Sequence, residues 1–572
     1  MNQNKLLSSK IAYPMFSLMG IFFLFCCLTE HDLASAGNIH WTGAYTFRVI
    51  AISLTGGILI GIILCRVFAK YAERQFQKPK KAAVIKPMGR KKQLIFFAAS
   101  LALITLAWLP SWLAYYPGIC SYDSYIQVEQ IVSGEYIDHH PIAHTLLIRA
   151  AMWLGENLFG SVNAGIGLYS LIQLISLSAV FAYGIILLRN SGAVPGCLFL
   201  IQLLCMFYPF HLYMSVTVTK DVYFTVFFLL LLFNLLEFLT HDVYPVRTAL
   251  SFLLSTAAMI LFRKNGSYAF AVLLFVLLLT IIIRKKQRQY WKRIFLFALA
   301  GFIIGILSLN FLFDVTGASP EDKREMLSMP IQQLARTMIY HGGAGVLAED
   351  DNTMGEAEKS LINDFILSEA YKDYDAHISD PVKRHTNTYV VRYRAKDFIS
   401  AYLKLLSKYP GDFLNAVLEI NSGYLYPWDV SHAHINVNEQ LKGMGYIQTC
   451  WTEYSLTENG IYKDSKWDTL HKRMEEWADE NAYLTLPLLK YLFMPGIWLW
   501  LYLLLFGYLA LRKKFRLCLP LILVFGYYAT LFLGPTVQLR YLYPIMCAFP
   551  FLALLCLIKS RPCPPAINTD IH

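Results

Sequence analysis

The feature that most constrains this chain is a series of uncharged apolar runs, each about 17–25 residues long. A run of this length crosses a bilayer as a helix, because a helix satisfies every backbone polar group within one segment. Hydrophobic residues make up 56% of the chain and charged residues only 16%, which supports the same interpretation. The sequence therefore predicts an all-α polytopic membrane protein with about twelve transmembrane helices, near residues 11–29, 48–65, 93–113, 163–188, 196–214, 222–239, 246–262, 267–283, 293–313, 488–511, 517–534 and 541–558.

The first apolar run has an alternative interpretation as a secretory signal peptide. The segment "LASAG" at 33–37 offers small residues at the spacing of a cleavage site. We favour a retained helix, because the run is long and Glu30, His31 and Asp32 separate it from the small residues.

Basic residues predict the orientation of these helices. Lys and Arg crowd the connections at 66–92, 284–293 and 512–516, whereas the alternate short connections hold few of them. By the positive-inside rule, both termini then lie in the cytoplasm of a multi-pass cell-membrane protein. The formal charge of +11 is accounted for by these inner loops, so it does not indicate a nucleic-acid partner. The segment 314–487, with about ten more acidic than basic residues, is predicted to lie outside.

The chain divides into three predicted parts. Residues 1–313 form a transmembrane module of about nine helices with an outer loop at 114–162, and residues 488–572 hold three closing helices and a cytoplasmic tail. Between them, 314–487 is predicted to be a mainly helical extracytoplasmic domain, with a helical pair on either side of the Pro410-Gly411 break. Cys120 and Cys450 lie clearly outside the predicted spans, and a disulfide between them is left open.

Several cations stand at the outer ends of predicted spans, against the positive-inside preference. "TVTKDVYF" holds Lys220 beside Asp221, "LFRKNGSY" holds Arg263 and Lys264, and "GPTVQLRYLYP" holds Arg540. Snorkelling of the long side chains to the headgroups would account for any one of them. For loops that all open on one face we favour a binding role, because clustered cations suit the oxygens of a phosphate or pyrophosphate.

Acidic and histidine residues gather in the loop at 114–162. Asp123 falls in the first turn of a predicted short helix from Ser121 to Val132, where the helix dipole alone would favour an acid. Asp138 could simply begin the next segment. His139 and His140 are adjacent and make a weak metal pair, so contact with a substrate is the better interpretation for both. Gln127, in the same short helix as Asp123, is a further candidate for substrate binding.

At these residues the chain resembles the integral-membrane glycosyltransferases of the GT-C superfamily. In that superfamily the first large outer loop carries a catalytic acid followed by a Pro-containing turn, and "PGICSYDSYIQ" with "DHHP" is similar to it. "RYLYP" at 540–544 resembles the Arg-Tyr-x-x-Pro that opens a late span in many members, which includes Tyr541 in the substrate site. "TKD", "RKNG", "PIQQLART" and "GYLYP" resemble an uncharacterised bacterial branch. Unlike the better-known members, this chain has two spans before the span that precedes the acidic loop, and its acids stand apart as Asp123 and Asp138.

The resemblance implies an inverting glycosyl transfer on the outer membrane face. Asp123, or less readily Asp138, would act as general base on an acceptor hydroxyl, and the sugar would come from a polyprenyl-phosphate donor. Arg540 with Lys220 or Arg263 would hold the departing phosphate. The expected partners are a polyprenyl-phosphate-linked sugar, a cell-envelope acceptor and membrane lipid. The sequence requires no cofactor and leaves a divalent metal open.

A secondary transporter or flippase of a lipid-linked or anionic substrate is the main alternative, because twelve spans with both termini inside is a common transporter layout. Transporters usually hold ionisable residues near the middle of the membrane. Here Glu237 is the one acid within a predicted span and lies near its inner end, so the enzymatic interpretation is favoured.

Overall fold

Helices make up the regular structure of the chain in a computed structural model, which describes residues 9–77, 88–120, 123–240, 246–346, 352–428, 456–479 and 485–559. Within these residues β pairing is limited to isolated bridges. The prediction of an all-helical fold is therefore confirmed. Cys450 lies outside the described residues, so its pairing with Cys120 stays a prediction.

Eight helices of the described chain are long and apolar enough to cross a membrane. They are α1 (Ser9–Ala36), α2 (Gly43–Gln77), α3 (Arg90–Ala114), α6 (Val162–Asn190), α9 (Lys220–Thr240), α11 (Lys264–Ile283), α12 (Arg288–Thr316) and α25 (Leu539–Lys559). The other four predicted spans coincide with shorter apolar helices, which are α7 (Pro195–Phe207), α10 (Val246–Phe262), α23 (Pro495–Leu511) and α24 (Leu519–Leu531). The chain is thus a multi-pass membrane protein by the length and composition of its helices.

Prolines explain where two of the shorter helices begin or end. The predicted span at 196–214 is divided into α7 and α8 (Pro209–Met214), because Pro209 offers no backbone N–H to continue α7. Pro495 likewise begins α23 and separates it from the short α22 (Leu489–Leu492).

The segment 114–162, predicted to be an outer loop, contains more helix than the sequence predicted. The predicted short helix is α4 (Asp123–Ser133), and a second helix, α5 (Ile142–Phe159), follows it. Pro141 precedes the first turn of α5, and Gly160 ends it in the left-handed conformation that glycine adopts without strain. This helix was not predicted, because its apolar residues are interrupted by His144, Arg149 and Glu156.

The segment between α12 and α22 is built from short helices. The predicted helical pair is observed as α17 (Ala395–Lys408) and α18 (Pro410–Ile420). The other elements among the described residues of this segment are η2 (Lys323–Leu327), α13 (Ser328–His341), α14 (Glu356–Asn363), η3 (Ser368–Tyr371), α15 (Asp380–Arg384), α16 (Thr388–Tyr393), α19 (Ser422–Leu425) and α21 (Asp468–Asp479). Two further 3-10 turns, η1 (Lys285–Gln287) and η5 (Phe515–Cys518), precede α12 and α24.

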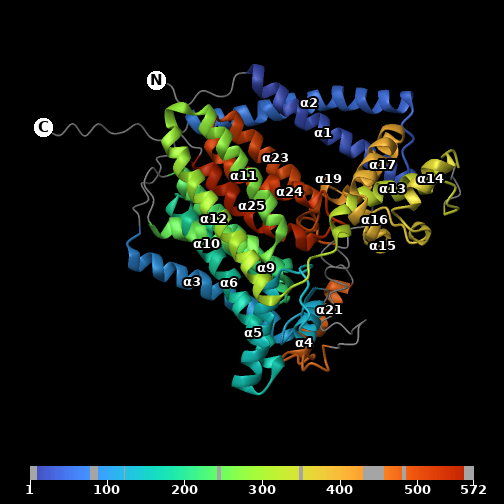
Figure 1. The fold of residues 1–572 in the computed structure, drawn as a ribbon. Coiled ribbons are helices and arrows are strands. Elements are labelled where there is room, and N and C mark those ends of the chain that lie inside the picture. Colours follow the sequence, from blue (N-terminus) through green and yellow to red (C-terminus); the bar gives the residue numbers. More distant parts are fainter. Residues whose placement is uncertain are drawn as a thin grey trace.

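The two largest hydrophobic clusters among the described residues form separate cores. The larger core fills the helix bundle around α9. Of the most apolar stretch of α9, 83% is buried, and the helix packs against α6, α10 and α25. The smaller core joins α13 to α17 and α18 through residues such as Leu334, Phe398 and Phe413. In Figure 1 the helices α13 to α17 lie beside the bundle, and α4, α5 and α21 gather at one of its ends.

Backbone pairings join two pairs of segments at that end. The amide of Ile119 donates to the carbonyl of Val216, and the amide of Val218 donates back to Ile119, both at 2.9 Å. Gly118 has φ +151°, and a Cβ there would lie 3.0 Å from the Val216 carbonyl oxygen, so this crossing requires glycine. The amide of Asp138 donates to the Ser319 carbonyl at 2.9 Å. The loop after α3 therefore meets the loop before α9, and the loop between α4 and α5 meets the segment after α12.

Candidate functional site: an ion-pair cluster at four helix starts

Asp123 and three predicted cation positions lie at the starts of four helices. Asp123 is the first residue of α4, Lys220 the first of α9, Arg263 the residue before α11, and Arg540 the second residue of α25. A helix N-terminus carries partial positive charge, so it favours Asp123 and disfavours each of the cations. The convergence of these starts makes the location electropositive, which is a setting that favours bound anions.

The carboxylate of Asp123 is held by two cations. Lys220 Nζ lies 2.7 Å from its Oδ2, and the Arg540 guanidinium contacts Oδ2 at 3.1 Å and Oδ1 at 3.4 Å. Asp123 itself is only 9% exposed. A buried carboxylate with a fork-like arginine contact and a lysine contact is a strong, directional arrangement.

Asp221 forms the second carboxylate of the same cluster. It is fully buried, and its Oδ1 lies 2.9 Å from Arg263 Nη1. Arg540 Nη1 is 3.7 Å from the other oxygen of Asp221, so this guanidinium reaches both acids. The five residues carry three positive and two negative charges, which leaves one positive charge in excess.

Tyrosine rings support the two arginines. The ring of Tyr541 lies 4.5 Å from the Arg263 guanidinium carbon and 5.1 Å from that of Arg540, at distances typical of cation–π contacts. Tyr527, which was not predicted, accepts a hydrogen bond from Arg263 at 2.7 Å and donates one to the Tyr541 carbonyl at 3.0 Å. The local sequence does not distinguish Tyr527, because this residue lies inside an apolar span among other aromatic residues.

The surroundings of Asp123 keep it ionised. Burial alone would raise the pKa of this carboxyl, but the charges of Arg540 and Lys220 outweigh burial and hold that pKa well below its usual range. Asp123 is therefore a weak base as long as both cations contact it. Any neutralisation of Lys220 and Arg540 by another anion would make it a stronger one.

His140 lies against the same cluster as a neutral imidazole. Burial and the charge of Lys220 hold the pKa of His140 well below its usual value. Its Nδ1 is 3.1 Å from Lys220 Nζ and accepts that proton, which assigns the ring hydrogen to Nε2. Nε2 has no hydrogen-bond partner within the described chain. His140 thus fixes Lys220 beside Asp123 and leaves one ring N–H buried and unused.

Asp138, His139 and Lys264 form a neighbouring cluster around Glu321, a residue that was not predicted from the sequence. Lys264 Nζ lies 3.0 Å from Asp138 Oδ2 and 2.5 Å from Glu321 Oε2, and His139 Nδ1 lies 3.0 Å from Glu321 Oε1. Burial would raise the pKa of Glu321, but its contacts with His139 and Lys264 lower it. Asp138 is therefore paired with Lys264 and does not share the two cations that hold Asp123.

The same cluster contains three residues with the donor types of a metal site. One ligand atom each from His139, Glu321 and Glu325 lies within 4.8 Å of the other two. Each carboxylate already has a lysine partner at 2.5 Å, Lys264 for Glu321 and Lys383 for Glu325. A divalent ion would compete with these ammonium groups.

Gln127 belongs to a buried hydrogen-bond chain beneath α4. Its amide nitrogen donates to Thr145 at 2.8 Å, and its carbonyl oxygen lies 2.8 Å from His144 Nδ1. His144 Nε2 in turn lies 2.6 Å from the hydroxyl of Tyr169. Gln127 is fully buried, so its contacts tie α4 to α5 and α6. The predicted role of Gln127 in substrate binding stays a prediction.

Comparison with known proteins places the chain in a family without assigning its function. No curated protein and no solved structure gives a significant match. A family model described as a family of unknown function, DUF6020, matches residues 132–564. The matched range starts after Asp123 and Gln127 and includes every other predicted site residue. The chain therefore belongs to the DUF6020 family.

Proposed function

We propose that this protein is a membrane glycosyltransferase of GT-C type, which moves a sugar from a polyprenyl-phosphate donor to an acceptor hydroxyl of the cell envelope. The observation that carries the proposal is the pairing of the Asp123 carboxylate with Lys220 and Arg540 at the junction of four helix starts. A base and two phosphate-binding cations within contact of each other are the groups that this reaction needs. The loop motifs similar to those of GT-C enzymes point the same way.

The donor phosphate would replace Asp123 as the partner of the two cations. Its oxygens accept charge-assisted hydrogen bonds from Lys220 and Arg540, where the Asp123 carboxylate now sits. The pKa of Asp123 then rises toward its ordinary value, because the charges that lower it are neutralised by the phosphate. Donor binding would in this way produce the base beside the donor.

The transfer itself would be a single displacement. The acceptor oxygen attacks the anomeric carbon and forms the new glycosidic bond, while the bond from that carbon to the phosphate oxygen breaks. The polyprenyl phosphate leaves with the bonding electron pair and is stabilised by Arg540 and Lys220. The hydroxyl proton passes to Asp123, and the anomeric configuration is inverted. Asp138, paired with Lys264, is the weaker candidate for the base.

The site would face outward, with both termini in the cytoplasm. The helices α9, α11 and α25 begin at the Asp123 cluster and end near the basic connections, as the positive-inside rule requires of an outer site. A polyprenyl-phosphate donor suits this face, because the energy of the donor bond comes with the lipid and no nucleotide is needed. The reaction as written requires no cofactor.

The direct test mixes the purified chain with polyprenyl-phosphate sugars and candidate acceptors. The expected result is sugar transfer that is lost in Asp123→Asn. Undiminished transfer in Asp123→Asn removes the assignment of the base. Movement of the lipid-linked substrate across vesicle membranes without any transfer establishes the transporter or flippase instead.

A further inference from the structure

A second group of charged side chains lies at the opposite end of the helices that carry the Asp123 cluster. Lys220 begins α9, and Glu237 lies near its other end. At about 1.5 Å per residue these positions are about 25 Å apart, close to the thickness of a bilayer's hydrocarbon core. The far ends of α9, α11 and α25 therefore reach the other membrane face.

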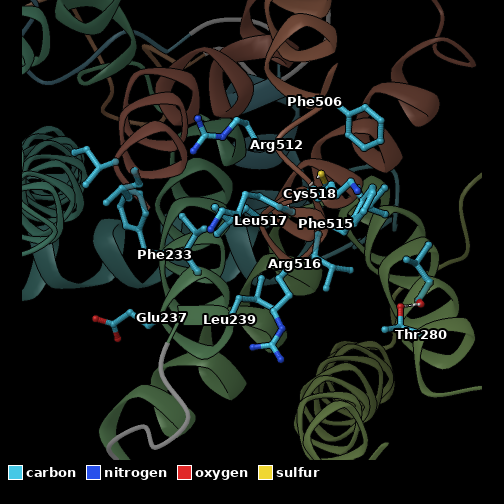
Figure 2. A pocket seen from close by; sticks show the side chains of 18 of the residues that line it. Phe233, Glu237, Leu239, Thr280, Phe506, Arg512, Phe515, Arg516, Leu517 and Cys518 are labelled. Atoms are coloured by element: carbon cyan, nitrogen blue, oxygen red, sulfur yellow. Dashed lines mark hydrogen bonds between the residues drawn. The ribbon is translucent and has the colours of Figure 1, made fainter. Parts of the chain in front are cut away.

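A cavity of about 1180 Å³ opens between these far ends, and Figure 2 shows many of its lining side chains. The cavity is large enough for a lipid headgroup or a comparable ligand. Glu237 is the one carboxylate among its described lining residues. The cationic lining residues come from the connections that follow α11 and α23, and they are Arg284, Arg512, Lys513, Lys514 and Arg516.

Three of these cations have no carboxylate partner among the described residues, unlike the cations of the Asp123 cluster. Among the described residues, no carboxylate lies within ion-pair distance of Arg284, Lys513 or Arg516. Arg516 instead lies over aromatic rings, with its guanidinium carbon 4.8 Å from the ring centre of Tyr290 and 5.7 Å from that of Trp291. Such stacking orients a guanidinium without neutralising it.

The backbone holds Lys513 in a conformation that lysine disfavours. Its φ is +55°, in the left-handed region that glycine usually occupies after a helix. The amide of Lys514 donates to the Leu509 carbonyl at 2.9 Å and closes the turn at the end of α23. The turn would form more easily with glycine, so a basic side chain is kept there at some cost to stability.

The positive-inside rule explains basic residues on this face but not their arrangement. That rule concerns the number of Lys and Arg in a connection, and it is satisfied by residues that point into water. Here the connections after α11 and after α23 direct cations to one cavity. Apolar residues of the spans, including Phe233, Val276 and Leu555, form much of the rest of the wall.

We propose that this cavity binds a phosphate-bearing ligand, with the phosphate among Arg284, Lys513 and Arg516. The apolar walls favour an anionic membrane lipid whose chains lie against the spans, and a soluble phosphate compound shares the same recognition chemistry. The inference stands on the cavity alone and holds whether or not the Asp123 cluster transfers a sugar.

The test uses the purified full chain in detergent and measures ligand binding by native mass spectrometry. The probes are dioctanoyl phosphatidylglycerol, dioctanoyl phosphatidylcholine as a zwitterionic control, and inorganic pyrophosphate as a soluble phosphate. The cavity variant is Arg284→Gln/Lys513→Gln/Arg516→Gln. Its matched control, Arg90→Gln/Lys91→Gln/Lys92→Gln, removes three exposed cations at the start of α3, in another of the connections predicted to be cytoplasmic.

We expect phosphatidylglycerol to bind at least about tenfold more weakly to the cavity variant, and the control variant to stay within about twofold of the natural chain. If pyrophosphate rather than the lipid shows this pattern, the phosphate site stands and its ligand is soluble. The proposal is overturned if neither probe binds, if both variants lose affinity equally, or if phosphatidylcholine binds as tightly as phosphatidylglycerol.

Discussion

Arg540 Nη1 lies 3.1 Å from the Asp123 carboxylate although 417 residues separate the two positions in the chain. The same nitrogen is 3.7 Å from Asp221, so one guanidinium links the start of α4 to the start of α9. This contact joins the segment between α3 and α6 to α25, and we expect both the stability and the proposed chemistry of the site to depend on it.

Replacing Asp123 with Asn removes the proposed base and the partner of two cations. We expect sugar transfer to fall by about 100- to 10,000-fold, the usual contribution of a general base. Thermal unfolding should also occur at lower temperature, because buried Lys220 loses its carboxylate partner and Arg540 keeps only the longer contact to Asp221, at a cost of about 3–5 kcal/mol. Transfer rates and melting temperature are both measured. Asp138→Asn is the matched control and should lower transfer by less than about tenfold.

Replacing Arg540 with Lys keeps the positive charge but loses the guanidinium group that contacts both oxygens of Asp123. A single ammonium group cannot contact both oxygens of Asp123 and still reach Asp221, so we expect a higher donor KM and a lower melting temperature. Arg394→Lys is the control, because Arg394 also contacts two carboxylates, Asp364 and Asp397, but its side chain is 46% exposed. An exposed pair contributes about 0–1 kcal/mol, so that variant should melt as the natural chain does. Equal melting of both variants would contradict the structural role of Arg540.

The depressed pKa of Asp123 predicts a specific dependence of stability on pH. Because the folded pKa lies well below the ordinary value of 3.8, the stabilising contribution is complete above that value and is lost as pH falls below it. Asp123→Asn lacks this contribution at every pH. The difference in melting temperature between the natural chain and Asp123→Asn should therefore shrink between about pH 5 and about pH 2. A difference that stays constant over this range would show that the carboxylate is not held by the two cations.

The sequence predicted the parts of the fold and the site that depend on local pattern. Apolar run length identified the eight long apolar helices of the described chain and four shorter ones, and the positive-inside rule drew attention to Lys220, Arg263 and Arg540 because they are exceptions to it. The short helix after Cys120 was predictable from its own amphipathic pattern and the glycine that follows it. Each of these signals lies within about twenty residues.

The parts that were missed depend on contacts between distant segments. Glu321 lies 57 residues from Lys264 and meets it only because α12 returns the chain to the same end of the bundle. Tyr527 supports Arg263 across 264 residues. Nothing in the local sequence distinguishes either residue from its neighbours, because the pairing is set by how helices pack and not by spacing along the chain.

Replacing Gly118 with Ala should loosen the loop that leads to Asp123. The residue has φ +151°, and an added Cβ would lie 3.0 Å from the Val216 carbonyl oxygen and 3.2 Å from Ser170. We expect a loss of about 1–3 kcal/mol of stability, seen as a lower melting temperature. Gly89→Ala is the control, because an added Cβ there has no atom within 4 Å. Identical melting of the two variants would mean that the crossing of the two loops tolerates a side chain.

Whether sugar transfer needs a metal depends on whether an ion can displace the lysines that pair with the carboxylates of the group His139, Glu321 and Glu325. Their ligand atoms lie close enough to share an ion, but Lys264 and Lys383 already neutralise the two carboxylates. The base and the phosphate-binding cations of the proposed reaction lie in the neighbouring Asp123 cluster and need no ion there. We therefore expect sugar transfer to continue in excess EDTA, with Glu325→Gln as active as the natural chain. If EDTA abolishes transfer, Mg²⁺ or Mn²⁺ restores it, and Glu325→Gln needs more of either ion, then the cluster is a metal site and the lysines are displaced when it fills.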